Sequence, residues 1–98
     1  MDEQLDFGTN IRRVRLKHKL TQAQFAEIIG KSQSTVHGYE NNTIIPPFGV
    51  LLTISSLFNI PVRVLMGLDH PNAPVVDAEE LRAIYDAYVK LIGEEVDE

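Results

Sequence analysis

The chain has 98 residues, of which 44% are hydrophobic and 23% charged, with a formal net charge of −5 and no cysteine. This length suits one small domain with an additional element, the apolar content argues against wholesale disorder, and the lack of cysteine excludes disulfides, thiolate zinc sites and cysteine nucleophiles. The acidic N-terminus lacks the basic region of a secretory signal, and no apolar run approaches the roughly 20 residues that cross a bilayer, so we expect a cytoplasmic protein.

Two short helices are predicted in the first third of the chain. Ile11, Val14 and Leu16 approximate helical spacing, which predicts a helix over about residues 8–18 with these side chains toward a core. The segment Thr21–Gln24 is a capping-box pattern, in which a threonine hydroxyl and a glutamine side chain satisfy the first amides of a helix. Apolar residues with helical periodicity follow, and Gly30 supplies the stop, so the second helix spans about two turns.

Three further helices are predicted between residues 32 and 67. Ser32 is a favourable N-cap for the third helix, and the pair Asn41-Asn42 can adopt the left-handed conformation that ends it. The adjacent prolines 46 and 47 exclude a helix interior, so a loop precedes a fourth helix over about residues 48–58. Pro61 opens a fifth short helix that ends at Gly67. The fourth helix is expected to bury five side chains, namely Leu51, Leu52, Ile54, Leu57 and Phe58.

The last third of the chain is predicted to contain a linker and one more helix. Residues 69–76 include two prolines and are typical of a linker. Residues 77–98 contain an amphipathic helix, which opens with an Asp-x-x-Glu cap. Its apolar stripe at helical spacing consists of Leu81, Ile84, Tyr85, Tyr88, Leu91 and Ile92. Because no segment alternates as a strand does, the sequence predicts an all-α protein.

Charge is distributed in blocks along the chain. The net charge of −5 taken alone argues against a nucleic-acid partner. However, residues 12–31 carry six of the nine lysines and arginines and a single acid, whereas nine acids and two basic residues lie in residues 69–98. Because salt screens charges beyond about 8 Å, the basic segment acts locally. Charge alone leaves two alternatives open, a surface for phosphate and a solvated basic helix face.

The second and third predicted helices, joined by Gly30-Lys31-Ser32, form a helix-turn-helix unit. Over about residues 8–67 the chain resembles the phage repressor and Cro-type (XRE-like) helix-turn-helix family. The resemblance rests on the order and spacing of Ile11, Arg12, Arg15, Leu20, Thr21, Gln22, Phe25, Ala26, Ile29, Gly30, Ser32–Val36, Tyr39, Glu40, Pro46 and Leu65–Gly67. It implies a five-helix, lambda-repressor-like DNA-binding domain over residues 1–68, followed by the extra helix.

The resemblance also implies how DNA would be bound. The N-terminus of the second helix, with Gln22, would hold a phosphate, and the third helix would enter the major groove with its first residues. Gln33 would face a base edge, where glutamine bonds adenine bidentately. The alternative is that Gln33 is only a polar surface residue. The full set of expected DNA contacts is Gln22, Ser32, Gln33, Ser34, Thr35, His37 and Asn41.

By the same resemblance, Arg15 and Glu40 form a structural ion pair that ties the first helix to the third. The alternative role for Arg15 is a phosphate contact. If the pair is buried, loss of one partner would leave the other charge unpaired, at a cost of about 3–5 kcal/mol. The apolar positions of the unit are expected in the core, namely Phe25, Ala26, Val36 and Tyr39.

Two features depart from the family pattern. Gly38 stands where relatives often carry a long polar side chain that contacts a base, and glycine has no side chain to make this contact. It also weakens the helix by about 1 kcal/mol relative to alanine. The loop over residues 42–45 lacks the basic residues that relatives often place on phosphate. We therefore expect modest affinity and a modest salt dependence.

The last helix lies outside the family's domain, and its apolar stripe is too extensive to leave in water. It could pair with its copy in a second subunit, dock on its own domain or receive another protein. We favour the homodimer, because two recognition helices about 34 Å apart read a two-fold operator. The expected dimer seam is the whole stripe described above.

We therefore predict a sequence-specific regulator of transcription that binds double-stranded DNA, a dimeric repressor of bacterial or phage origin. The alternatives are an antitoxin of a toxin–antitoxin pair and a protein-interaction module of the same fold without DNA binding. A protein partner would be an anti-repressor or a toxin. We expect no enzymatic activity, cofactor or metal, because His18, His37 and His70 fall on different elements and no catalytic motif is present.

Overall fold

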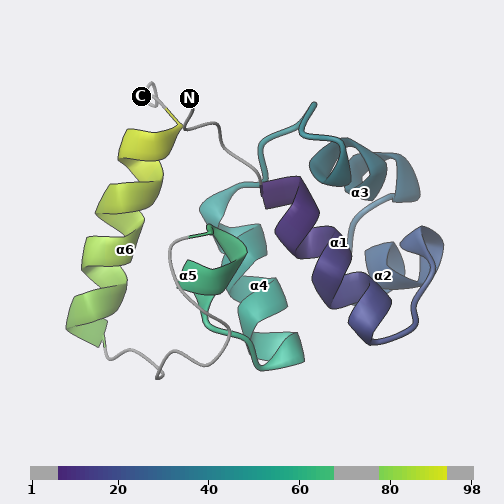
Figure 1. The fold of residues 1–98 in the computed structure, drawn as a ribbon, viewed down its shortest axis with the longest axis horizontal. Helices are drawn as coiled ribbons and strands as arrows, with labels where there is room; N and C mark the ends of the chain where they lie inside the picture. The colour runs from purple at the N-terminus through teal and green to yellow at the C-terminus, as the bar shows by residue number, and fades with distance from the viewer. Residues whose placement is uncertain (1–6, 68–77, 93–98) are drawn as a thin grey trace.

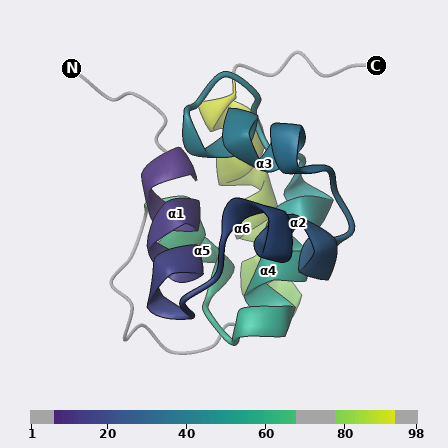
Figure 2. The same ribbon diagram turned by 90° about the vertical axis from the view of Figure 1, so that its right-hand side faces the viewer.

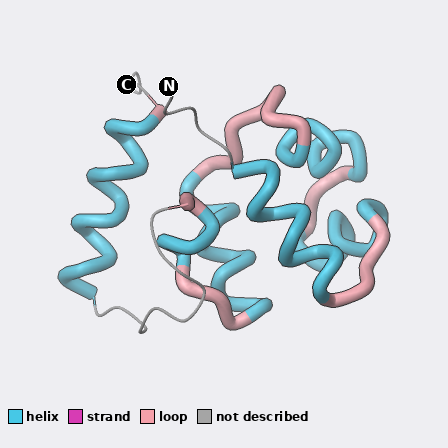
Figure 3. Tube along the Cα trace, viewed as in Figure 1, coloured by secondary structure: helices cyan, strands magenta, loops and turns pink. Residues whose placement is uncertain are grey.

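The computed structural model describes residues 7–67 and 78–92, and the regular structure within these ranges is entirely helical (Figure 3). The helices are α1 Phe7–Lys17, α2 Gln22–Ile29, α3 Gln33–Glu40, α4 Phe48–Phe58, α5 Val62–Leu65 and α6 Ala78–Leu91. This order confirms the predicted class, a five-helix domain followed by one further helix. The predicted linker 69–76 and the side chain of Leu81 lie outside the described part of the chain.

The helix-turn-helix unit is built from local caps. The Thr21 hydroxyl accepts the Gln24 amide at 3.0 Å, and the Gln24 side chain accepts the Thr21 amide at 2.9 Å, so the predicted capping box is present. Gly30 closes α2 with a φ of 76°, a left-handed conformation that glycine adopts without strain. Ser32 caps α3 by accepting the Thr35 amide at 3.1 Å. The turn between α2 and α3 is therefore encoded by its own residues.

A single core joins α1–α5. Its fully buried side chains include Ile11, Phe25, Val36, Leu51, Ile54 and Leu65. Two expected core residues instead face solvent: Leu16 is 57% exposed and Leu57 is 54% exposed. Leu16 lies about 200° around the helix from Val14, which is buried. In the last turn of α4, the ring of Phe58 fills the space against Phe25, with ring centres 5.3 Å apart, and Leu57 beside it is left outside.

Helix α6 packs against its own domain, beside α4 and the start of α1 (Figures 1 and 2). Tyr88 is buried, and its hydroxyl donates to the carbonyl oxygen of Pro46 at 2.7 Å. The Tyr88 ring lies 6.0 Å from that of Phe7 and 5.2 Å from that of Phe48, between centres. This is the second of the three arrangements that the sequence allowed.

Because α6 docks on its own domain, the prediction that its whole apolar stripe forms a dimer seam is wrong for part of the stripe. Ile84 and Tyr88, which we expected in a dimer seam, are buried in the core of their own chain, because Phe7, Pro46 and Phe48 offer them an apolar surface. Three stripe residues keep some exposure, namely Tyr85, which is 44% exposed, and the half-buried Leu91 and Ile92.

Candidate nucleic-acid interface

Helix α3 lies at the periphery of the molecule, far from α6 in Figure 1, and has one buried and one exposed face. Val36, Tyr39 and Glu40 are buried beneath it. The side chains expected to contact DNA lie elsewhere on the helix: Ser32, Gln33, Ser34, His37 and Asn41 are exposed, and Thr35 is half-buried. The structure thus brings these six residues together on one outward-facing polar surface.

Most polar groups on this face are already oriented by neighbours. The Ser32 hydroxyl lies 2.9 Å from that of Thr35 and 3.2 Å from that of Ser34. The Asn41 amide donates to the carbonyl oxygen of His37 at 2.9 Å and lies 3.0 Å from its ring Nε2. The side-chain amide of Gln33, by contrast, has no hydrogen-bond partner among the described residues. This amide is therefore available for a ligand.

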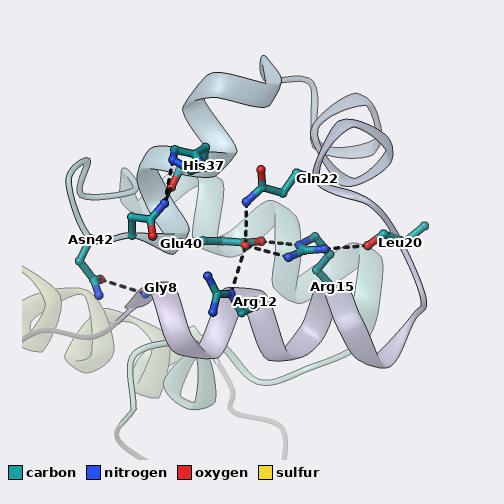
Figure 4. Close-up of polar contacts among 9 residues, drawn as sticks. Gly8, Arg12, Arg15, Leu20, Gln22, His37, Glu40 and Asn42 are labelled. Atoms are coloured by element: carbon teal, nitrogen blue, oxygen red, sulfur yellow. Dashed lines mark hydrogen bonds and ion pairs between the residues drawn. The ribbon is translucent and has the colours of Figure 1, made fainter.

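Beneath α3, the carboxylate of Glu40 joins three helices (Figure 4). Arg15 of α1 donates from Nε to Oε2 at 2.6 Å and from Nη2 to Oε1 at 3.0 Å, so the expected ion pair is present and bidentate. Gln22 of α2 donates from Nε2 to Oε1 at 3.1 Å. The Glu40 side chain is completely buried, and that of Arg15 is 12% exposed. This network fixes the orientation of α3 relative to α1 and α2.

Both members of the pair are stabilised in their charged forms. Burial of Glu40 favours the neutral acid, but the hydrogen bonds from Arg15 and Gln22 and the charge of Arg15 outweigh it and lower the pKa of this carboxyl. The hydrogen bond to Glu40 in turn raises the pKa of Arg15. The Nη1 of Arg15 also donates to the carbonyl oxygen of Leu20 at 2.9 Å, which leaves this guanidinium committed within the protein.

Three features of the site were not anticipated from the sequence. Gln22, expected on phosphate, also donates to Glu40, which uses one of the two N–H bonds of its amide. Arg12 adds a second guanidinium, with its Nε 3.5 Å from Glu40 Oε1 and its side chain 51% exposed. Its position three residues before Arg15, on the same side of α1, is the signal that could have revealed it.

The third feature is Gly8, which brings the first turn of α1 onto the end of α3. Its amide donates to the Asn42 side chain at 3.1 Å (Figure 4). A Cβ at this position would overlap the carbonyl oxygen of Glu40 and lie 2.7 Å from that of Tyr39. The close approach of the two backbones therefore requires glycine here.

The described parts of the chain contain neither a cluster of metal-binding side chains nor a membrane-spanning helix. No three histidine or carboxylate side chains there lie close enough to hold a metal ion. Nor does any helix in those parts have the length and apolar character needed to cross a bilayer.

Comparisons with known proteins agree with this geometry. The sequence pattern of the helix-turn-helix family matches residues 11–65. Over 72 residues the chain is 35% identical to YobD of Bacillus subtilis, described as an HTH-type transcriptional regulator, and 36% identical to the antitoxin PezA of Streptococcus pneumoniae. These matches cover 74% of this chain but 64% and 46% of the two relatives, so the chain spans only part of their length.

A solved transcriptional regulator from Listeria innocua has the same fold. The similarity covers 97% of this chain and 100% of that one, with a TM-score of 0.62 and 19% identity. The family is a DNA-binding, transcription-regulating type that normally lacks enzymatic activity. Because the family pattern spans more than half of the chain and includes both helices of the unit, this protein belongs to the helix-turn-helix family of the phage repressor and Cro (XRE) type.

Proposed function

We propose that this DNA-binding regulator recognises a specific duplex sequence in the major groove and acts as a dimeric repressor in a bacterium or phage. The observation that carries the proposal is the outward polar face of α3, on which the Gln33 amide has no partner in the described structure, above a buried carboxylate that fixes the helix. A repressor needs no more than occupancy of its operator, which a domain of this size provides. Its place of action would be the cytoplasm, where that DNA lies.

In the proposed complex, α3 enters the major groove with its N-terminal turn leading. Gln33 bonds an adenine edge, while Ser32, Ser34, Thr35, His37 and Asn41 line the rest of the contact surface. The second N–H of Gln22 and the first amides of α2 hold a phosphate, since the helix dipole favours an anion there. Arg12, which is half exposed and approaches the same Glu40 oxygen as Gln22, adds a positive charge near this phosphate site.

Alanine substitutions at Gln33 and Gln22 separate base reading from phosphate binding. Gln33→Ala should remove discrimination at one base pair, about 5- to 150-fold, because a bidentate contact is worth about 1–3 kcal/mol. Gln22→Ala should weaken binding to all sequences by a similar factor, because phosphates carry no sequence information. Fluorescence anisotropy on a duplex selected from a random pool by the full chain, and on its single-base variants, measures both effects at constant salt.

Two outcomes would contradict this docking geometry or the function itself. If Gln33→Ala preserves the base preference of the parent chain, α3 does not read bases as proposed. If the full chain binds no duplex even at low salt, the fold serves as a protein-interaction module without DNA binding.

We also propose that the homodimer forms through the flank of α6 that stays partly exposed, at Tyr85 and the half-buried Ile92. Truncation of α6 would uncover Phe7 and Phe48 and therefore makes a poor test. Tyr85→Glu should instead convert a dimer to a monomer in sedimentation velocity, because it places a charge in the apolar seam. Ala83→Glu, an exposed position about 200° away on the same helix, should remain dimeric. A full chain that sediments as a monomer at tens of micromolar contradicts this seam.

The match to the antitoxin PezA favours a second candidate, an antitoxin that binds DNA and holds a toxin. In that case the protein encoded beside this chain should form a stable complex with it when the two are co-expressed. If no protein encoded beside this chain binds it, the repressor is the better interpretation.

A further inference from the structure

Gly38 interrupts the outward face of α3 with a residue that has no side chain. It lies four residues after Ser34, so the two share one side of the helix. Val36 and Tyr39, which are buried, point to the opposite side. Although Gly38 is on the outer side, it is itself buried, which means that another part of the chain covers it.

The side chain that covers Gly38 belongs to Ile44, in the loop between α3 and α4. A Cβ built on Gly38 would overlap Ile44 Cδ1 and lie 2.7 Å from Cγ1 and 3.3 Å from Cβ of the same residue. Ile44 therefore occupies the space into which a side chain at position 38 would project. Glycine is what allows the isoleucine to rest directly on the helix.

The loop is held in this position by the backbone of Gly38. The amides of Thr43 and Ile44 donate to the Gly38 carbonyl oxygen at 2.9 and 3.2 Å, and the Thr43 hydroxyl donates to it at 3.3 Å. Asn42, with a φ of 60°, turns the chain back toward the helix. Ile44 is thus attached to α3 at one defined place, although it is not part of the helix.

Ile44 remains 42% exposed, so filling the core does not account for its position. Because it covers Gly38, this partly exposed side chain lies on the side of α3 that also carries Ser34, His37 and Asn41. When a polar surface docks into a groove of DNA, an apolar side chain on it must contact an apolar group of the DNA. Otherwise it removes water from polar groups of the DNA without replacing their hydrogen bonds, which costs free energy. Among base-pair edges in the major groove, the apolar group is the 5-methyl of thymine.

We propose that Ile44 reads the 5-methyl group of a thymine in the bound duplex, in place of a side chain at position 38. The inference rests on the proposed docking of α3 in the major groove. Gly38 then has a function, because it leaves room for a side chain of the neighbouring loop, Ile44, to contact the base. Specificity at this base pair comes from burial of a methyl group instead of a hydrogen bond.

The test removes the methyl group from the DNA and the side chain from the protein. In a duplex selected from a random pool by the full chain, each thymine is replaced in turn by deoxyuridine, which lacks only the 5-methyl group. Burial of one methyl group is worth about a fourfold change in affinity, so deoxyuridine at the position that Ile44 contacts should weaken binding by about that factor for each half-site that carries it. Ile44→Ala should bind the thymine and deoxyuridine duplexes equally well.

Two further variants make the result specific. Ile45→Ala removes the adjacent isoleucine, which is 48% exposed, and should keep the deoxyuridine penalty. Gly38→Ala should reduce the penalty, because its methyl group displaces Ile44. Circular dichroism of each variant confirms that it is folded.

The outcomes distinguish this inference from the function on which it rests. If no deoxyuridine weakens binding, or if Ile44→Ala still binds the deoxyuridine duplex about fourfold more weakly than the thymine duplex, the role of Ile44 is refuted while DNA binding stands. If the full chain selects no duplex, DNA recognition itself is refuted, and the reading by Ile44 with it.

Discussion

Replacement of Glu40 by alanine should lower the free energy of unfolding by about 3–5 kcal/mol, the usual cost of stranding one charge of a buried pair. Arg15 is 12% exposed, and the substitution would leave its Nε and Nη2 without their carboxylate. The Gln22 amide would lose the same acceptor. Urea unfolding followed by circular dichroism measures the change.

Arg12→Ala is the matched control for this substitution. It removes another partner of the same carboxylate, but one that lies 3.5 Å away with a side chain 51% exposed. Exposed ion pairs contribute about 0–1 kcal/mol, so this variant should unfold close to the parent chain. Equal losses for Glu40→Ala and Arg12→Ala would contradict the assignment of Arg15 as the principal partner.

The same carboxylate makes stability depend on pH. Because the pKa of Glu40 is lower in the folded chain than in the unfolded one, its contribution is fully present above the ordinary carboxyl pKa of 4.5. The contribution is lost as the pH falls through the lower, folded value. The stability difference between the parent chain and Glu40→Gln should therefore be largest near neutral pH and shrink in acid. A difference that stays constant from pH 7 down to the acid transition would contradict this linkage.

The second large effect is expected at Gly8. Gly8→Ala should destabilise the chain by about 1–3 kcal/mol, because overpacking forces rigid neighbours to move. The added Cβ meets the backbone carbonyls of Tyr39 and Glu40, which cannot rotate away as a side chain would. The higher helix propensity of alanine, about 1 kcal/mol, offsets only part of this. Thermal and urea unfolding measure the net change.

Gly49→Ala provides a control of opposite sign. Gly49 lies in the first turn of α4, and a Cβ there meets no atom within 4 Å. The substitution should stabilise the chain by about 0.4–1 kcal/mol, through the reduced entropy of the unfolded state. If Gly8→Ala also stabilises the chain, α1 is not pressed against α3 as described.

The exposure of the α3 positions could be predicted from the sequence, whereas the contacts beneath α3 could be predicted only in part. The α3 positions follow from the Ser32 cap and helical spacing, and the Arg15–Glu40 pair follows from the family resemblance. Leu16 and Leu57 show the limit of periodicity. The few apolar residues of α1 define its buried side only loosely, whereas the many apolar residues of α4 extend beyond the side that is buried. Ile84 and Tyr88 show a second limit. An apolar stripe on a helix indicates that the stripe is covered, but it does not indicate which surface covers it.

The sequence by itself determined the helices, their order, the turn between α2 and α3, and the family, because caps and stops act between residues at most five positions apart. Only the tertiary structure decided that Gln22 meets Glu40, that Gly8 supports the end of α3, and that Tyr88 reaches Pro46. These contacts join residues 18, 34 and 42 positions apart. Such contacts depend on how whole helices pack against one another. A local sequence pattern does not indicate which distant segment of the chain will pack beside it.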